Sequence, residues 1–208
     1  MSTKALLITE VTPRAGSTKQ VVDAWAALMP PKSSVTQRAI YQSLDGEVAL
    51  ELCALNTLAD ATTLESWWAL AREKLSPNLA SDFRRQLLTF VEAPKDTSDA
   101  LPATAYLQLR HVEVPPDRYA DYRAWRERTI FDVVRTATEV EVFLAYHTVL
   151  STEPGVMFVS GFSGPVEDYT AVFSSPRYQQ IVREAGDQFI TGGDRGLYTR
   201  LYQRIAVA

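Results

Sequence analysis

Apolar and polar positions alternate along the chain in blocks that predict two similar series of strands and helices. In the first series, apolar runs bounded by turn residues predict strands at 5–11, 35–44, 47–55 and 87–91. Apolar residues at helical spacing predict helices at 17–29 and 64–75. The second and third strands flank Asp45-Gly46, a dipeptide that favours a tight antiparallel hairpin. The first series therefore has the order β-α-β-β-α-β.

The same order of elements returns after a polar segment that contains two prolines. The second series has strand patterns at 104–114, 139–150, 156–162 and 197–205, and helix patterns at 118–137 and 165–189. Ser174-Ser175-Pro176 interrupts the last of these helix patterns. Trp25 and Trp125 each lie midway along the first helix of their series. We therefore expect two repeats, 1–92 and 104–208, joined by a linker at 93–103.

Both faces of the predicted strands are apolar, and this decides how the repeats are arranged. In the strand at 139–150, Val142, Leu144 and Tyr146 alternate with Phe143, Ala145 and His147. An antiparallel sheet with helices on one side only would have a polar second face. The second face therefore needs burial, and we expect the two sheets to pack against each other with the helices outside. The expected fold class is α+β, with two ferredoxin-like repeats that form a pseudo-dimer within one chain.

Composition and charge exclude two classes of partner. The net charge of −4 comes from 21 Lys and Arg and 25 Asp and Glu residues without a concentrated basic patch, so we expect no nucleic-acid partner. The apolar runs are far shorter than the ~20 residues that cross a bilayer, so we expect no membrane partner. The one cysteine, Cys53, cannot form an intrachain disulfide, and the N-terminus lacks a signal-peptide pattern. A cytoplasmic location is expected.

Two segments of the second repeat resemble the dimeric α+β barrel superfamily. Residues 106–115, Tyr-Leu-Gln-Leu-Arg-His-Val-Glu-Val-Pro, and the helix after them are similar to the first strand and helix of NIPSNAP-like and antibiotic-biosynthesis monooxygenase members. Residues 173–179, Phe-Ser-Ser-Pro-Arg-Tyr-Gln, are similar to the Ser-Pro-x-Tyr segment that interrupts the second helix in several small barrel families of this superfamily. The superfamily also includes EthD-like proteins. The resemblance implies a pseudo-dimeric α+β barrel with a ligand pocket between a repeat's sheet and its helices. It leaves open whether the repeats pair within one chain or across a homodimer.

The two histidines are the candidates for acid–base chemistry. His111 ends the first strand of the second repeat, and His147 lies in its second strand. By alternation, His111 shares an apolar face with Leu109, and His147 shares one with Phe143, so we expect both rings to be partly buried and to face one pocket. Arg110 is then expected between the two sheets. Each imidazole is either a general base near neutral pH, a haem ligand, or a hydrogen-bonded structural histidine.

Aromatic and apolar side chains near the histidines are the candidates for holding a ligand. The expected substrate-binding residues are Trp125, Tyr122, Phe143, Leu109 and Phe173. Indole rings supply rigid apolar area. Trp67, Trp68 and Trp125 are therefore expected either to fill the core or to wall a flat aromatic substrate.

The leading functional hypothesis follows from the resemblance to cofactor-independent antibiotic-biosynthesis monooxygenases. It is a tailoring enzyme in which His147 or His111 deprotonates a phenol or enol of an apolar, polyketide-like molecule, and the carbanion reacts with dioxygen. The second hypothesis is haem binding by a histidine axial ligand, as in the chlorite-dismutase-like members of the superfamily. The third is a non-catalytic module for small-ligand binding or assembly. No metal site is expected, because no His, Cys and carboxylate cluster has metal-ligand spacing.

Overall fold

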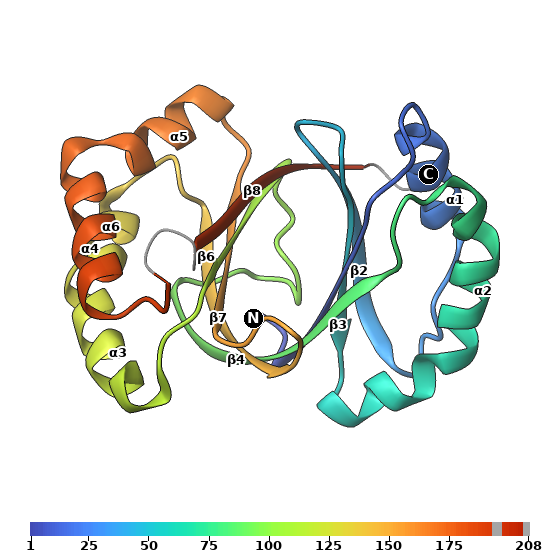
Figure 1. The fold of residues 1–208 in the computed structure, drawn as a ribbon, viewed down its shortest axis with the longest axis horizontal. Coiled ribbons are helices and arrows are strands. Elements are labelled where there is room, and N and C mark those ends of the chain that lie inside the picture. The colour runs from blue at the N-terminus through green and yellow to red at the C-terminus, as the bar shows by residue number, and fades with distance from the viewer. Residues whose placement is uncertain (193–196, 206–208) are drawn as a thin grey trace.

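A closed barrel of eight antiparallel strands forms the centre of the molecule, and helices cover it on two opposite sides (Figure 1). The structure, a computed structural model, describes residues 1–192 and 197–205. The strands are β1 (Ala5–Val11), β2 (Val35–Ser43), β3 (Ala49–Leu55), β4 (Arg84–Lys95), β5 (Tyr106–Val112), β6 (Val142–Leu150), β7 (Val156–Phe162) and β8 (Leu197–Arg204). The predicted α+β fold, with antiparallel sheets packed as a pseudo-dimeric barrel, is confirmed.

The two halves contribute four strands each, in the same spatial order. The first half has the order β4-β1-β3-β2, and the second half has the order β8-β5-β7-β6. The halves join where β4 pairs with β6, from Leu87 opposite Leu150 to Lys95 opposite Phe143, and where β2 pairs with β8. Because the strands at the edges of each half pair with the other half, the barrel has no open edge.

Alternate side chains of every strand fill the inside of the barrel. Leu6 and Ile8 of β1 and Leu107 and Leu109 of β5 belong to this interior cluster and are at most 1% exposed. Burying one such side chain contributes about 1.5–3 kcal/mol relative to leaving it exposed. The second face of the strands is thus buried, as their apolar composition predicted.

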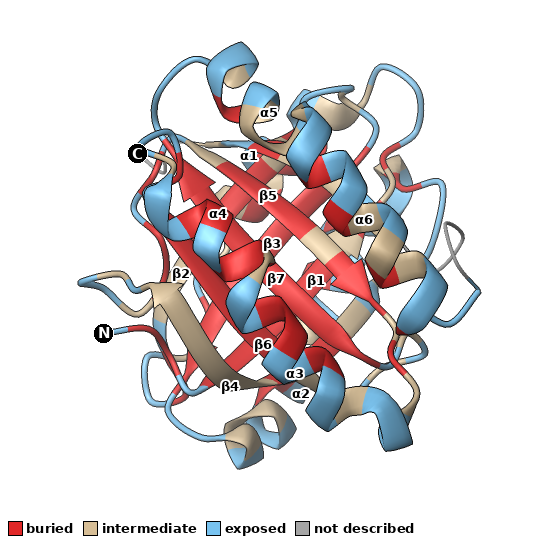
Figure 2. Ribbon diagram, turned by 90° about the vertical axis from the view of Figure 1, so that its left-hand side faces the viewer, coloured by how far each residue is buried: buried red, intermediate tan, exposed pale blue. Residues whose placement is uncertain are grey.

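Helices pack on the outer face of each half's sheet (Figure 1). They are α1 (Thr18–Ala27) and α2 (Glu65–Leu75) in the first half, and α3 (Tyr119–Arg128), α4 (Ile130–Thr136), α5 (Val166–Ser174) and α6 (Pro176–Gln188) in the second. Short 3-10 segments at Leu58–Leu64, Ser76–Asn78 and Pro116–Arg118 precede or follow them. Figure 2 shows that the second-half helices turn buried residues toward the sheet and exposed residues outward. None of the helices in the described residues has the length and apolar character needed to span a membrane.

One predicted helix is divided in two, and one predicted strand is longer at both ends. The helix expected at 118–137 is two helices, because the backbone of Thr129 leaves the helical region, with φ −121° and ψ −81°. The Thr129 hydroxyl donates to the Trp125 carbonyl at 2.8 Å, which supports this bend. Strand β4 continues to Lys95 and so includes the first residues of the linker expected at 93–103.

Candidate functional site

The two histidines lie on opposite faces of the second-half sheet. His111 on β5 shares its face with Leu109, as predicted, but that face is the barrel interior. His147 on β6 shares its face with Phe143, which packs against the helices, and its ring centroid is 5.1 Å from that of Tyr119. The prediction that both rings face one pocket is therefore wrong. For the same reason, Arg110 lies on the helix side of β5 and not between the sheets.

Backbone carbonyls fix the protonated nitrogen of each histidine. His111 Nε2 lies 2.9 Å from the Pro154 carbonyl oxygen, and His147 Nδ1 lies 3.0 Å from the Thr148 carbonyl oxygen. A carbonyl oxygen only accepts, so these nitrogens carry the hydrogen when the rings are neutral. His147 is then left with Nε2 as its basic nitrogen.

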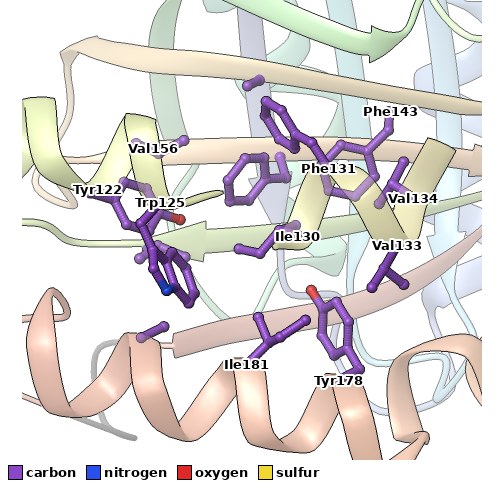
Figure 3. Packing of buried hydrophobic residues seen from close by; sticks show 14 of the residues in the cluster. Tyr122, Trp125, Ile130, Phe131, Val133, Val134, Phe143, Val156, Tyr178 and Ile181 are labelled. Carbon is purple, nitrogen blue, oxygen red and sulfur yellow. The ribbon is translucent and has the colours of Figure 1, made fainter. Parts of the chain in front are cut away.

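The space expected to hold substrate, between the second-half sheet and its helices, is filled by side chains (Figure 3). Trp125, Tyr122 and Phe143 belong to one buried cluster, and Phe173 packs against it. The Trp125 and Tyr122 rings stack with centroids 6.0 Å apart. A void of about 20 Å³ remains beside Tyr122. Leu109, the fifth predicted binding residue, lies on the barrel side of the sheet, away from the other four.

An open pocket of about 300 Å³ adjoins His147 at one end of the second half. Besides His147, its lining consists of Glu113, Val114, Pro115, Pro116, Tyr119, Pro154 and Gly155. The lining is mostly apolar, and Tyr119 meets the imidazole edge-to-face. His147 is therefore placed next to a space that a small apolar molecule can enter.

A larger cavity, of about 520 Å³, lies in the first half between β4, α2 and the turn that joins β6 to β7. Its lining consists of Leu7, Ala61, Trp68, Phe83, Arg84, Arg85, Gln86, Leu87, Leu150, Ser151, Thr152 and Glu153. Arg84 Nη2 lies 2.5 Å from Glu153 Oε1, so an ion pair between the two halves borders this cavity. The first half, not the second, holds the larger of these two open spaces.

Arg85 is held between two aromatic rings in the wall of this cavity. Its guanidinium carbon lies 4.6 Å from the Trp68 ring centroid and 4.8 Å from that of Phe83. Arg85 Nε and Trp68 Nε1 are buried and have no hydrogen-bond partner among the described residues. Burial lowers the pKa of Arg85, and the Arg72 guanidinium nearby lowers it further. The Arg85 side chain thus places a positive charge in the wall of a largely apolar cavity, whereas its Nε and Trp68 Nε1 are closed off from solvent.

A buried ion pair lies on the same outer face of the first-half sheet. Glu51 on β3 is 1% exposed, and its carboxylate accepts from Arg38 Nε at 2.5 Å. Burial raises the pKa of Glu51 from its ordinary value, although the Arg38 guanidinium opposes this effect and Arg85 adds a weaker opposing effect. The positive charge of Arg85 therefore acts on Glu51 as well as on the cavity.

Of the residues that line this cavity, Trp68 was predicted from the sequence as a possible wall of a binding site, whereas the charged residue Arg85 was not. Trp68 was among the tryptophans expected to fill the core or to wall a flat substrate. Arg85 was missed because the strand was expected to begin at residue 87, although extending the alternation back from Leu87 puts Arg85 on the same face. No short-range pattern indicated that Phe83 would approach the arginine.

Haem does not fit the surroundings of either histidine. The pocket at His147 is at the lower end of the volumes typical of small-ligand sites, and the Tyr119 ring edge stands against the imidazole. The neighbouring space under the helices is filled, and the imidazole of His111 is buried in the barrel. The 520 Å³ cavity has space for a flat molecule, but its lining contains no histidine.

No protein-family model matches the sequence, and no curated protein matches it significantly. Solved structures do match. An anthrone oxidase-like protein has a TM-score of 0.71 at 9% identity, covering 97% of this chain and 91% of that chain. A proposed monooxygenase from Fusobacterium nucleatum subsp. nucleatum has a TM-score of 0.69 at 7% identity, covering 99% and 94%.

A proposed chlorite dismutase matches with a TM-score of 0.62 at 10% identity, covering 100% of this chain and 96% of that chain. Identities this low are evidence of a shared fold and not of a shared reaction. The fold that these proteins share is the one that the two sequence segments predicted. By its closed barrel and these structural likenesses, the chain shares the α+β barrel fold of these solved structures.

Proposed function

We propose that the protein is a small-molecule enzyme that binds a flat aromatic compound with an acidic hydroxyl group in the first-half cavity. The observation that carries this proposal is the Arg85 guanidinium, held between Trp68 and Phe83 at the edge of a 520 Å³ cavity. That volume is within the range of sites for small organic ligands.

The lining of the cavity supports an aromatic and partly anionic ligand. The Trp68 and Phe83 rings are flat and apolar, and an aromatic ligand can stack against such rings. The Arg85 side chain lines the cavity and supplies a positive charge, which an anionic oxygen atom of the ligand would neutralise. A phenolate or enolate oxygen fits this requirement better than a neutral ether or methyl group.

The proposed reaction is an oxygen transfer in which the substrate supplies the electrons. Water in the open cavity accepts a proton from an acidic C–H or O–H group, the Arg85 charge stabilises the resulting enolate, and a proton returns to the peroxide anion after dioxygen adds. A C–O bond to dioxygen then forms at the enolate carbon, and loss of water from the hydroperoxide leaves a carbonyl. A CH₂ group and O₂ thus become C=O and H₂O, so the substrate is the only reductant.

His147 supports a second candidate site. Its Nδ1–H bond to Thr148 leaves Nε2 as a base beside a pocket of about 300 Å³. A phenol or enol bound there could lose its proton to His147, as the sequence hypothesis has it, with Tyr119 against the ring. His111 is less suited to this role, because it is 7% exposed and bonded to Pro154. For either site we place the reaction in the cytoplasmic biosynthesis of aromatic, polyketide-like compounds.

Oxygen uptake with anthrone as the probe tests both sites. We expect Arg85→Gln to lower kcat/KM about 100-fold or more, the usual loss when a group that stabilises an oxyanion is removed. His147→Ala should then leave the rate unchanged. Arg177→Gln is the matched control, because this arginine is exposed and pairs with Asp132 in the second half, outside the cavity lining.

The other outcomes separate the alternatives. A loss confined to His147→Ala would move the reaction to the second pocket. If anthrone binds saturably but neither the wild type nor any variant consumes oxygen, the protein is a binding module and not an enzyme. Neither uptake nor binding would contradict the proposal at both sites.

A further inference from the structure

Glu153 is the one carboxylate in the wall of the first-half cavity, among the residues that the structure describes. It lies in the turn between β6 and β7, which belongs to the second half. The other polar groups of the lining are two arginines, a glutamine, the Trp68 indole and the hydroxyl groups of Ser151 and Thr152. Guanidinium and indole N–H groups only donate, and neutral amide and hydroxyl oxygens are too weakly basic to keep a proton. Glu153 is therefore the side chain of this lining that can take up a proton.

Two side chains of β4 hold the Glu153 carboxylate at the edge of the cavity. Arg84 Nη2 donates to Glu153 Oε1 at 2.5 Å, and Gln86 Nε2 donates to Glu153 Oε2 at 3.3 Å. Arg84 and Gln86 are two residues apart on one strand, so they project from the same face and reach the same carboxylate. The Glu153 side chain is still 37% exposed, so water reaches it. The carboxylate thus has a defined position and remains open to proton exchange.

The turn that contains Glu153 is itself held against β5. The Pro154 carbonyl, next along the chain, accepts from His111 Nε2 at 2.9 Å. Gly155 has a φ of +131°, and a Cβ at this residue would lie 2.3 Å from the Val112 carbonyl oxygen. Glycine therefore allows the turn to approach β5 more closely than another residue could. These contacts position Glu153 before any ligand binds.

The ion pair with Arg84 positions Glu153 without preventing its protonation. The Arg84 side chain is 65% exposed. Water screens a pair as exposed as this one, so the pairing stabilises the carboxylate only weakly. Glu153 also lines a more polar pocket of about 250 Å³, together with Glu10, Tyr198 and Arg200. The carboxylate thus lies between the apolar cavity and a polar pocket through which a proton can exchange with solvent.

We propose that Glu153 is the proton acceptor of the oxygen transfer in the first-half cavity, an inference that rests on the function proposed above. The substrate C–H bond breaks with its electron pair left on the enolate, and water passes the proton to the Glu153 carboxylate. Dioxygen then forms the C–O bond, and the Glu153 carboxylic acid returns the proton to the peroxide anion. This step gives the hydroperoxide and regenerates the carboxylate. The first half thus supplies the charge of Arg85, and the second half supplies the base.

Deuterium exchange of anthrone in the absence of oxygen tests the proton transfer by itself. We expect the whole protein in deuterium oxide to accelerate exchange of the acidic C–H hydrogens of anthrone, followed by NMR. Glu153→Gln should lower this catalysed exchange, and kcat for oxygen uptake, about 100-fold or more, the usual contribution of a general base, while KM changes little. Glu127→Gln is the matched control and should have wild-type rates. Glu127 is also a partly exposed glutamate paired with an arginine, Arg135, at 2.6 Å, but it lies outside the cavity lining.

Rescue by small carboxylates separates a base from a structural role. Sodium acetate should restore much of the exchange rate of Glu153→Ala, because acetate can occupy the vacated space and accept the proton, whereas sodium chloride at the same ionic strength should not. Wild-type exchange by Glu153→Gln, or no rescue of Glu153→Ala, would overturn the inference, and oxygen uptake that still requires Arg85 would leave the proposed function standing. Exchange that depends on Glu153 without oxygen uptake would contradict the proposed function alone. A wild-type protein that catalyses neither would overturn both.

Discussion

Arg38 connects a helix end to a buried carboxylate in the first half. Its Nη1 donates to the Leu28 carbonyl and its Nη2 to the Trp25 carbonyl, each at 2.6 Å, at the C-terminal end of α1. Its Nε pairs with Glu51 at 2.5 Å. The carbonyls at the end of a helix lack partners within the helix, so Arg38 satisfies them and neutralises Glu51 at the same time. Removing it therefore affects two buried groups.

We predict that Arg38→Met destabilises the protein by about 3–5 kcal/mol at neutral pH, because it leaves the Glu51 carboxylate buried and unpaired. The destabilisation should decrease as the pH falls toward the ordinary glutamate pKa. The pKa of Glu51 is already raised by burial in the folded protein, and without Arg38 it rises further. A raised folded-state pKa contributes stability below the unfolded-state pKa, and this stability is lost as the pH rises through the folded-state pKa. Urea unfolding measured across this pH range checks the slope.

The double variant Arg38→Met with Glu51→Gln is the control for this slope. It has no carboxylate at residue 51, so its unfolding free energy should not show the extra pH dependence. A slope as steep in the double variant as in Arg38→Met would mean that other groups cause it.

For individual site residues, the sequence predicted only which side chains share a face of a strand, because this follows from the alternation of side chains along the strand. Alternation correctly grouped His111 with Leu109 and His147 with Phe143. It could not say which group faces the helices, because both faces of these strands are apolar. The position of Arg85 beside Trp68 and Phe83 depends on packing between α2 and β4, which local sequence does not encode.

At the scale of elements, the break between α5 and α6 shows how a short polar motif ends one helix and begins the next. Ser175 has extended backbone angles and precedes Pro176, the first residue of α6. Its hydroxyl accepts from the Tyr178 backbone N–H at 3.3 Å and donates to the Val172 carbonyl at 2.9 Å. The sequence predicted this break because proline cannot continue a helix, whereas the bend at Thr129 has no such signal.

We predict that Ser175→Ala lowers the free energy of unfolding by about 1 kcal/mol, the usual value of an N-cap hydrogen bond. Ser174→Ala is the neighbouring control, since its hydroxyl bonds only to carbonyls of the preceding turn and caps no helix. Its effect should stay within about 0.5 kcal/mol, as for most surface substitutions. Equal losses in chemical denaturation of the two variants would argue against the capping role.

At the scale of the whole molecule, the closed barrel makes the two halves depend on each other. The strand pairs β4–β6 and β2–β8 join them, and the inner faces of both sheets form one interior cluster. Sequence reasoning predicted this packing from the need to bury a second apolar face. It did not predict which half has the larger open cavity, because that depends on how completely several elements fill the space under the helices.

We predict that residues 1–103 and 104–208, produced as separate chains, do not remain monomeric on their own. Each chain would expose the inner face of its sheet and two unpaired edge strands, features that favour self-association. Mixed together, they should form a one-to-one complex with the far-ultraviolet circular dichroism of the intact protein, measured with size-exclusion chromatography and light scattering. Leu109→Asp in the second chain should prevent the complex, because Leu109 is fully buried in the barrel, whereas Leu70→Asp in the first chain should not, because Leu70 is 40% exposed on α2. A stable folded monomer of either chain would show that one half can bury its sheet without the other.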